Sequence, residues 1–279
     1  MSTSSTRPPG LAPLYVRALL GARAHRSDTL PTGQYSVEGH TIDAGALARY
    51  QRICGFRVSD TVPATYPHVL AFPLTMHVMV QRDFPFPAPG LVHVANSISQ
   101  HRPLRLGESI TLRVRVAGLR PHSAGREFDV LTDAGVGDEA VWSSRSTYLH
   151  RERSAERAPR QPAQAHAPSG ATAIWRMPAD IGRRYAMISA DRNPIHLSAL
   201  TARPFGFRRP IAHGMWVAAR VLATLEGRLP QAFSYDVTFK TPILLPATVS
   251  LTTSRDDPGW TLDLRDARTG KPHLTGTVA

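Results

Sequence analysis

The most continuous apolar stretch in the second half of the chain, positions 211–225, predicts a helix that is apolar on nearly every side. Its apolar positions are Ile211, Ala212, Met215, Trp216, Val217, Ala218, Ala219, Val221, Leu222 and Leu225. A helix without a polar face has to be buried inside a protein. We therefore expect this helix at the centre of a folded unit.

Strand-like alternation of apolar and polar residues follows that helix. It occurs at 235–239, 249–251 and 260–264, and the first half shows the same alternation at 112–116. A period of two is typical of half-buried strands. A buried helix followed by antiparallel strands predicts an α+β fold in which a sheet wraps around the helix.

A faint repeat relates the two halves of the chain at an offset of 139 residues. The segments "PLRLGESITL" (103–112) and "PILLPATVSL" (242–251) share one pattern, and the same offset places Met76 under Met215. A repeat of this kind indicates two copies of one fold. The alternative is chance similarity between amphipathic strands.

A segment of linker composition separates these halves. Residues 151–170, "RERSAERAPRQPAQAHAPSG", are rich in Pro, Ala, Arg and Ser and almost without large apolar side chains. The sequence thus predicts an N-terminal unit over 1–150, with a mobile tail and a helix in 1–30, and a C-terminal unit over 171–279. Both units have an ordinary domain length.

The composition of the 279 residues, 42% hydrophobic and 19% charged, predicts a folded protein and excludes general disorder. No run approaches the roughly 18 apolar residues that span a membrane, and Arg17 and Arg23 interrupt the apolar N-terminal patch. Cys54 is the only cysteine, so an intrachain disulfide and a thiolate metal cluster are excluded. We expect a cytoplasmic protein in which Cys54 is buried.

The formal net charge is +12, and all but two of the 33 basic residues are Arg. A basic surface attracts polyanions such as nucleic acid or a phosphorylated thioester carrier, coenzyme A or an acyl carrier protein. An Arg-rich solvated surface is the simpler alternative. Zinc-finger spacing, an RNA-recognition signature and a basic helix with heptads are all absent from the sequence, so we expect no nucleic-acid partner.

Polar groups crowd into one stretch, "SADRNPIHLSALTARPFGFRRPIAHGM" (189–215). Asp191, Asn193 and His196 lie within six residues and are separated by Pro194, which bends the chain and breaks regular pairing. This pattern predicts a loop that holds three polar side chains. An Asx-type turn that caps the next element is the alternative.

The end of the same stretch predicts a helix start. Pro210 occupies a favoured position before the buried helix, which places His213 and Gly214 in its first turn. Backbone N–H groups are free there and the helix dipole is positive, so the Gly214 N–H is a candidate donor to an oxyanion. The alternative is a glycine required only for close packing of the helix on a sheet.

An oxyanion donor beside a carboxylate and an imidazole suits chemistry at the α-carbon of a thioester. Loss of the α-proton gives an enolate, whose charge N–H donors stabilise. His196, with an ordinary pKa near ~6.5, can move the proton, while Asp191 polarises a water molecule and Asn193 orients one of the two. Together they add or remove water across a carbon–carbon double bond. We expect no metal, because one His and one Asp make a poor zinc set.

The pattern Tyr185-x-x-x-Ser189-x-Asp191-x-Asn193-Pro-Ile-His196, followed by Gly206-Phe and Pro210-Ile-Ala-His213-Gly214-Met215, resembles the hydratase motif of the MaoC-like family. Members are (R)-specific enoyl thioester hydratases and 3-hydroxyacyl thioester dehydratases of hotdog fold. The resemblance implies a double hotdog without a cofactor, acting on acyl groups carried by coenzyme A or acyl carrier protein. It also implies a catalytic dyad of Asp191 and His196, supported by Asn193, and a thioester oxygen bound by the Gly214 N–H.

The first half departs from this motif. The offset of 139 puts "RICGFR" (52–57) in place of the dyad and Leu74-Thr75 in place of His213-Gly214, so we expect that half to be catalytically silent. In similar two-unit proteins the degenerate half widens the acyl pocket, which implies a medium or long acyl chain here.

Several residues have weaker assignments. Tyr185 and Ser189 are expected to position the loop. Ser189 and His213 are also expected to contact the substrate, and Arg208 and Arg209 either contact carrier phosphates or are solvated loop residues. His68, His77 and His93 are expected in the core or on the surface.

Two other functions stay open from the sequence. One is a hotdog acyl thioesterase, and the other is a non-catalytic basic protein that binds a carrier or nucleic acid. Because hotdog units pair and both units lie in one chain, a monomer and a homodimer are both open.

Overall fold

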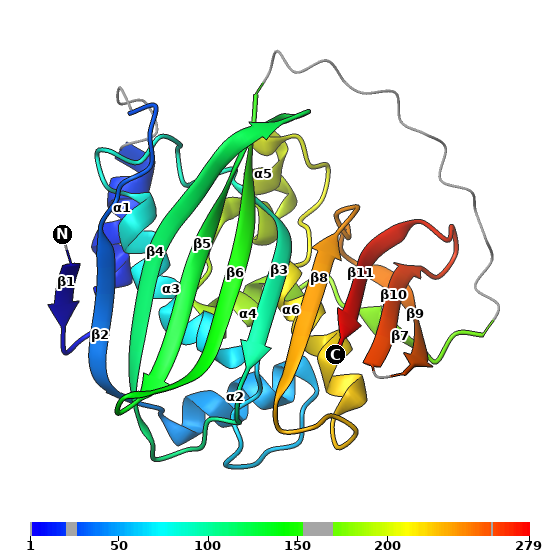
Figure 1. Cartoon of the computed structure of the whole chain (residues 1–279). Coiled ribbons are helices and arrows are strands. Elements are labelled where there is room, and N and C mark those ends of the chain that lie inside the picture. Colours follow the sequence, from blue (N-terminus) through cyan, green and yellow to red (C-terminus); the bar gives the residue numbers. More distant parts are fainter. Residues whose placement is uncertain (1, 21–26, 153–169, 258) are drawn as a thin grey trace.

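One sheet of eleven strands forms the front of the molecule, and the helices lie behind it (Figure 1). The computed structural model describes residues 2–20, 27–152, 170–257 and 259–279. The strands are β1 (Ser2–Ser5), β2 (Gln34–Thr41), β3 (Val92–Gln100), β4 (Ser109–His122), β5 (Gly125–Val136), β6 (Glu139–Arg151), β7 (Ala173–Met177), β8 (Phe233–Phe239), β9 (Ala247–Asp256), β10 (Gly259–Asp266) and β11 (Pro272–Val278). Their order in space is β1-β2-β4-β5-β6-β3-β8-β11-β10-β9-β7.

The pairing of β3 with β8 joins two half-sheets into one. These two strands run antiparallel, from Ala95 opposite Thr238 to Gln100 opposite Phe233. Only β1 and β2 pair in parallel among the described strands. Each half-sheet has its own helix behind it, so the predicted α+β arrangement of two sheet-wrapped helices is confirmed.

The helices gather on one face of this sheet (Figure 1). They are α1 (Leu11–Leu20), α2 (Ala44–Cys54), α3 (Tyr66–Met79), α4 (Ile181–Ser189), α5 (Ala199–Ala202) and α6 (Gly214–Leu222), with single 3₁₀ turns η2 (Pro194–His196), η3 (Arg203–Phe205) and η4 (Ala223–Leu225). Both α3 and α6 are buried over most of their length. Cys54, at the end of α2, is buried as expected.

The central helix of the second unit begins later than the sequence predicts. The backbone just before it is extended, because Ile211 forms a bridge with Leu244 and the Ala212 N–H donates to the Ile243 carbonyl at 3.0 Å. His213 is therefore the N-cap residue and Gly214 the first helical residue. The expectation that Pro210 opens the helix is wrong, since strand-like pairing takes up the backbone that follows it.

The repeat is real for the strands but has a different offset for the helices. In the first unit the Val62 N–H donates to the Leu104 carbonyl, just as Ala212 donates to Ile243 in the second. Residues 104 and 243 keep the predicted spacing of 139, whereas 62 and 212 lie 150 apart. The expected match of Met76 with Met215 is therefore wrong, because the first unit has a longer connection between helix and strand.

Within its described residues the N-terminal segment contains a strand, β1, and a helix, α1. Residues 2–5 form β1 and pair with β2, and α1 packs against α3 through Leu14, Ala18, Phe72 and Met76. The predicted linker lies almost wholly outside the described residues; β6 ends at Arg151 and β7 begins at Ala173.

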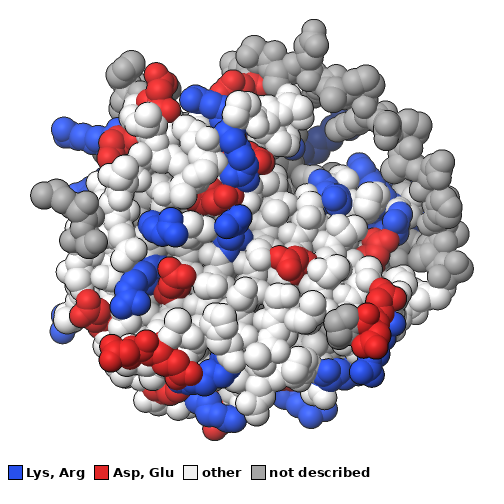
Figure 2. All heavy atoms as spheres, viewed as in Figure 1, with Lys and Arg blue, Asp and Glu red and all other residues white. Residues whose placement is uncertain are grey.

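Charges of both signs are interspersed on the outer face of the sheet (Figure 2). Arg120 pairs with Glu127 and Asp129 at 2.6 and 3.0 Å. Arg102 pairs with Glu108 and Glu139 at 2.8 and 2.9 Å. This face is therefore not a continuous basic patch of the kind that tracks a nucleic-acid backbone.

The helices within the described residues are all too short or too polar to cross a membrane.

Candidate active site

A sharp turn after α4 places Asp191. Ala190 has a left-handed backbone with φ of 60°, which is uncommon for a residue other than glycine. The Ser189 hydroxyl donates to the Tyr185 carbonyl at 3.0 Å and accepts from the Asp191 N–H at 3.3 Å. Ser189 was predicted to contact the substrate, and the structure places its hydroxyl on the backbone of this turn.

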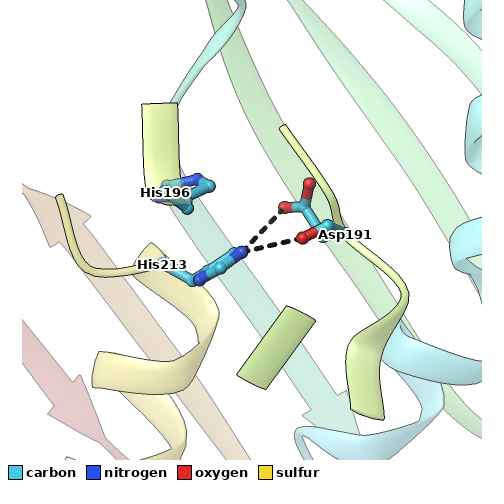
Figure 3. Close-up of side chains that lie close together, drawn as sticks. All are labelled: Asp191, His196 and His213. Atoms are coloured by element: carbon cyan, nitrogen blue, oxygen red, sulfur yellow. Dashed lines mark hydrogen bonds and ion pairs between the residues drawn. The ribbon is translucent and has the colours of Figure 1, made fainter. Parts of the chain in front are cut away.

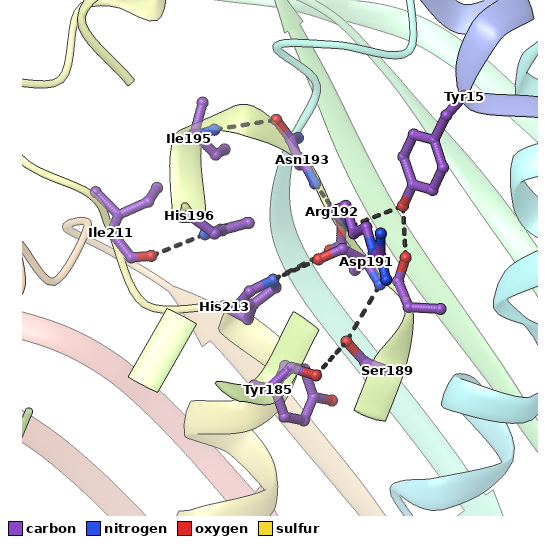
Figure 4. Close-up of polar contacts among 11 residues, drawn as sticks. Tyr15, Tyr185, Ser189, Asp191, Arg192, Asn193, Ile195, His196, Ile211 and His213 are labelled. Carbon is purple, nitrogen blue, oxygen red and sulfur yellow. Dashed lines mark hydrogen bonds and ion pairs between the residues drawn. The ribbon is translucent and has the colours of Figure 1, made fainter. Parts of the chain in front are cut away.

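The Asx turn and the polar loop prove to be the same structure. The Asp191 carboxylate accepts from the Asn193 N–H at 3.1 Å, and the Asn193 side-chain oxygen accepts from the Ile195 N–H at 3.4 Å. The second bond starts η2, which carries His196. Asn193 thus orients Asp191 through its backbone and His196 through its side chain (Figure 4).

The first unit has a matching turn without these groups. Helix α2 ends at Cys54 and Gly55 then has a left-handed φ of 82°, as Ala190 does after α4. Counting from these turns, Phe56 and Thr61 occupy the places of Asp191 and His196. The offset of 139 puts "RICGFR" in place of the dyad, four residues earlier than the helix ends do. Neither placement has a carboxylate or an imidazole where the second unit has Asp191 and His196.

His196 is a neutral base with one free nitrogen. Its Nδ1 lies 2.8 Å from the Ile211 carbonyl oxygen, which can only accept, so we assign the hydrogen to Nδ1 and a lone pair to Nε2. Burial, and then the neighbouring His213, lower the pKa of His196 to about 3. The imidazole is therefore uncharged near neutral pH, and Nε2 is able to accept a proton.

Close packing against α4 fixes the position of η2. Gly182 lies in the first turn of α4, and a Cβ atom there would collide with the carbonyl oxygen of His196. This glycine therefore lets the 3₁₀ turn lie directly on the helix. The sequence motif did not single it out, because the contact joins two separate elements.

His213 lies against Asp191 and His196. Its Nε2 is 3.0 Å from the Asp191 carbonyl oxygen and 3.8 Å from Oδ2 of the carboxylate (Figure 3). Its ring stacks on that of His196 with centroids 3.7 Å apart. Burial lowers the pKa of His213 to about 4, so the ring is neutral and Nε2–H is the donor. His213 was predicted to contact the substrate, and the structure places it as a support for Asp191.

The Asp191 carboxyl is poised for proton chemistry. Burial raises its pKa above the ordinary value, while His196 and the Asn193 N–H oppose that rise. The Asp191 side chain is nevertheless 31% exposed to solvent. This carboxylate therefore faces both the buried imidazoles and open space.

His213 is a third side chain, beside Asp191 and His196, that could ligate a metal ion. One ligating atom each of Asp191, His196 and His213 lies within 4.8 Å of the others. However, Nδ1 of His196 and Nε2 of His213 already bond to backbone carbonyls, and the two rings are stacked. The sequence-based argument against a metal missed His213, and the absence of a metal stays a prediction.

Gly214 meets both proposed requirements at once. A Cβ atom there would lie 3.0 Å from the Phe239 ring, so a larger residue would have to displace that ring. Gly214 also lines the same cavity as Asp191 and His196, and α6 is uncapped by side chains of the described residues. Its N–H lies at the positive end of the helix, where an oxyanion is stabilised.

This cavity, of about 150 Å³, lies between the two units. His68 of α3 and His93 of β3 line it, with their rings stacked 5.8 Å apart. Both were expected only in the core or on the surface, and nothing in the local sequence marks them. Arg208 and Arg209 are exposed and do not line it, whereas Arg151 and Lys240 do, as do Tyr185, Ser189, Asn193 and His213.

The site combines a carboxylate, a neutral imidazole and a helix N-terminus that the described side chains leave uncapped, and it lies between two half-sheets that each wrap around a helix. This combination is typical of a double-hotdog hydratase or dehydratase. The chain belongs to the MaoC-like family. Residues 154–275 match the MaoC like domain. The chain is 42% identical over 278 residues to 3-hydroxyacyl-thioester dehydratase X of Mycobacterium tuberculosis, covering 98% of this chain and 99% of that protein.

Two further similarities agree with this assignment. The (R)-specific enoyl-CoA hydratase of Aeromonas caviae is 35% identical over 81 residues, which cover 26% of this chain and 60% of that protein. The crystal structure of HtdX from M. tuberculosis superposes with a TM-score of 0.80 at 39% identity, covering 88% of this chain and 98% of that one. The predicted family, fold and enzyme class are confirmed.

Proposed function

We propose that the protein interconverts trans-2-enoyl thioesters and (3R)-hydroxyacyl thioesters by reversible syn addition of water. The observation that carries this proposal is that the Asp191 carboxylate, His196 and the first helical residue Gly214 share one cavity. The similarity to a 3-hydroxyacyl-thioester dehydratase and an enoyl-CoA hydratase supports the same reaction.

In the hydration direction His196 accepts a proton from water on Nε2 while the water oxygen bonds to C3. The electrons of the double bond move to the thioester oxygen, and the Gly214 N–H stabilises the enolate. The Asp191 carboxylate accepts a hydrogen bond from the second hydrogen of the water, which stays on the oxygen, and stabilises the imidazolium. His196 then returns its proton to C2 from the same side, so one water is consumed and the addition is syn.

The test is hydration of crotonyl-CoA and longer enoyl-CoAs. The loss of the conjugated enoyl absorbance measures the rate, and chiral analysis identifies the product. Formation of the (3R) alcohol supports the proposal, and the (3S) product contradicts it. A saturated acyl-CoA tests the thioesterase alternative, which predicts release of free thiol. Salt-sensitive binding to duplex DNA without any turnover would favour the non-catalytic alternative.

The imidazole of His196 is expected to remain neutral from about pH 8 to about pH 5. Its pKa is lowered to about 3, whereas an imidazole in water titrates near ~6.5. NMR of ¹⁵N-histidine-labelled protein measures this directly, and the His196→Gln variant assigns the signal. A titration midpoint near ~6.5 for that signal would contradict the lowered pKa, and ¹⁵N shifts that place the hydrogen on Nε2 would contradict the assigned tautomer.

A second cavity, of about 140 Å³, is proposed to hold the acyl chain. It shares Phe72, Leu91, Tyr148, Asp191 and Asn193 with the first cavity. Its far wall is apolar and comes from α1, α3 and the segment before β3, through Ala18, Met76, Met79, Ala88 and Pro89. A chain that enters here from the reacting carbons is desolvated, which favours medium or long acyl groups.

Filling this cavity is expected to shorten the preferred acyl chain. Ala18→Phe places a ring at its wall, and excluding about four methylene groups costs ~3 kcal/mol, or roughly a 10²-fold loss of kcat/KM on a long enoyl-CoA. Turnover of crotonyl-CoA is expected to fall by a smaller factor, and only through displacement of α1, which Ala18 packs against α3. The matched control is Val16→Phe on the same helix, where the side chain is 54% exposed. Equal losses on short and long substrates would contradict the assignment of the cavity.

The nature of the carrier belongs to the same proposal. Arg151 and Lys240 line the cavity from opposite units and suit the phosphates of coenzyme A or a carrier protein better than the predicted Arg208 and Arg209. Both carriers fit this proposal, as do a monomer and a homodimer, and the cytoplasmic location stays a prediction.

A further inference from the structure

Tyr15 of α1 contacts both peptide groups that flank Asp191. Its hydroxyl donates to the Ala190 carbonyl at 2.5 Å and accepts from the Arg192 N–H at 2.7 Å (Figure 4). A phenol offers one donor and acceptor lone pairs, so a single oxygen satisfies both backbone groups. The contact reaches from the N-terminal unit to a loop 177 residues away.

The turn that Tyr15 holds is one that needs support. Ala190 has its left-handed φ of 60° at the residue just before Asp191, and such a conformation persists only where its surroundings fix it. His213 holds the Asp191 carbonyl from one side at 3.0 Å. Tyr15 holds the N–H of that same peptide group, and also the Ala190 carbonyl of the preceding one, so the direction of the carboxylate depends on both side chains.

Helix α1 is itself firmly placed. Leu14 and Ala18, on either side of Tyr15 along the helix, are buried against Phe72 and Met76 of α3. Burial raises the pKa of Tyr15 well above its ordinary value, so the phenol stays neutral and keeps its hydrogen. The hydroxyl is therefore presented to the loop by a packed helix.

We propose that Tyr15 is a positioning residue for Asp191: by bonding to Ala190 and Arg192 it fixes the carboxylate relative to His196. This inference rests on the proposed hydratase function, because it assigns Asp191 to the reaction. The sequence motif does not contain Tyr15, and α1 belongs to the unit without a catalytic dyad.

The test is Tyr15→Phe, which keeps the ring and removes only the hydroxyl. We expect kcat for crotonyl-CoA to fall by about 10- to 10²-fold with KM within about twofold, since a small misplacement of a reacting group has this effect. The control is Leu14→Ala, which loosens α1 but leaves the hydroxyl. It is expected to lower Tm while keeping kcat within about threefold.

A second measurement does not depend on turnover. Hydrogen exchange of the peptide that contains the Arg192 amide is expected to accelerate about tenfold in Tyr15→Phe, because that N–H loses its acceptor, and less in Leu14→Ala. Unchanged exchange overturns the proposal, and so does an unchanged kcat in Tyr15→Phe of an active enzyme. A raised KM at constant kcat also overturns it, because Tyr15 lines the second cavity and would then act only as part of its wall. An unmodified protein that fails to hydrate any enoyl-CoA refutes the proposed function instead, while the exchange result still tests the contact.

Discussion

Asp191→Asn is expected to lower hydration of crotonyl-CoA and longer enoyl-CoAs by about 10³-fold or more while the fold survives. An amide of the same shape has no charge to stabilise the imidazolium of His196, and general acid–base groups contribute about 10² to 10⁴ in rate. Its NH₂ group would also face Nε2–H of His213, placing a donor against a donor where Oδ2 now lies 3.8 Å away. Steady-state kinetics with saturating substrate measure the loss.

The fold is expected to tolerate this substitution, because the side chain keeps 31% of its exposure and the Asn193 N–H still finds an oxygen acceptor. Thermal unfolding checks this directly. The matched control is Asp180→Asn in the same unit, where the carboxylate makes no capping bond to α4. Near-normal turnover in Asp191→Asn would remove Asp191 from the mechanism.

His196→Gln is expected to lower the rate by a similar or larger factor, about 10³- to 10⁴-fold, because glutamine is not basic near neutral pH. The amide nitrogen can still donate to the Ile211 carbonyl, so the loop keeps that anchor. The matched control is His101→Gln, an exposed histidine outside the cavity. If His196→Gln keeps more than about a tenth of the unmodified rate, another group moves the proton.

The same variant is expected to change how stability depends on pH. His196 has a pKa of about 3 in the folded protein and ~6.5 when unfolded, so the unfolded chain binds more protons between these values. The contribution of the neutral His196 to the free energy of unfolding is complete above pH ~6.5 and is lost as the pH falls toward about 3. Tm of His196→Gln should therefore fall less steeply on acidification than Tm of the unmodified protein. Parallel curves would contradict the lowered pKa.

The sequence alone determined the family, the class of fold and the class of enzyme. Asp191, Asn193 and His196 lie within one short turn, and their spacing around Pro194 is a local requirement that a sequence records directly. The alternating strands at 235–239 and 260–264 likewise report the two faces of a sheet, and both became strands, β8 and β10. The motif and the periodicity were therefore sufficient to predict a hydratase on an α+β scaffold.

Only the tertiary structure decided how these groups are held. Tyr15 bonds to a loop 177 residues away, His213 bonds to the Asp191 carbonyl 22 residues away, and Gly182 makes room for the His196 carbonyl. Such contacts depend on which elements pack together, and hydrophobic periodicity reports only that a face is buried, not what it is buried against. The same reason explains the wrong helix start at Pro210, because pairing of residues 211–212 with 243–244 is non-local and overrides the local preference for a helix.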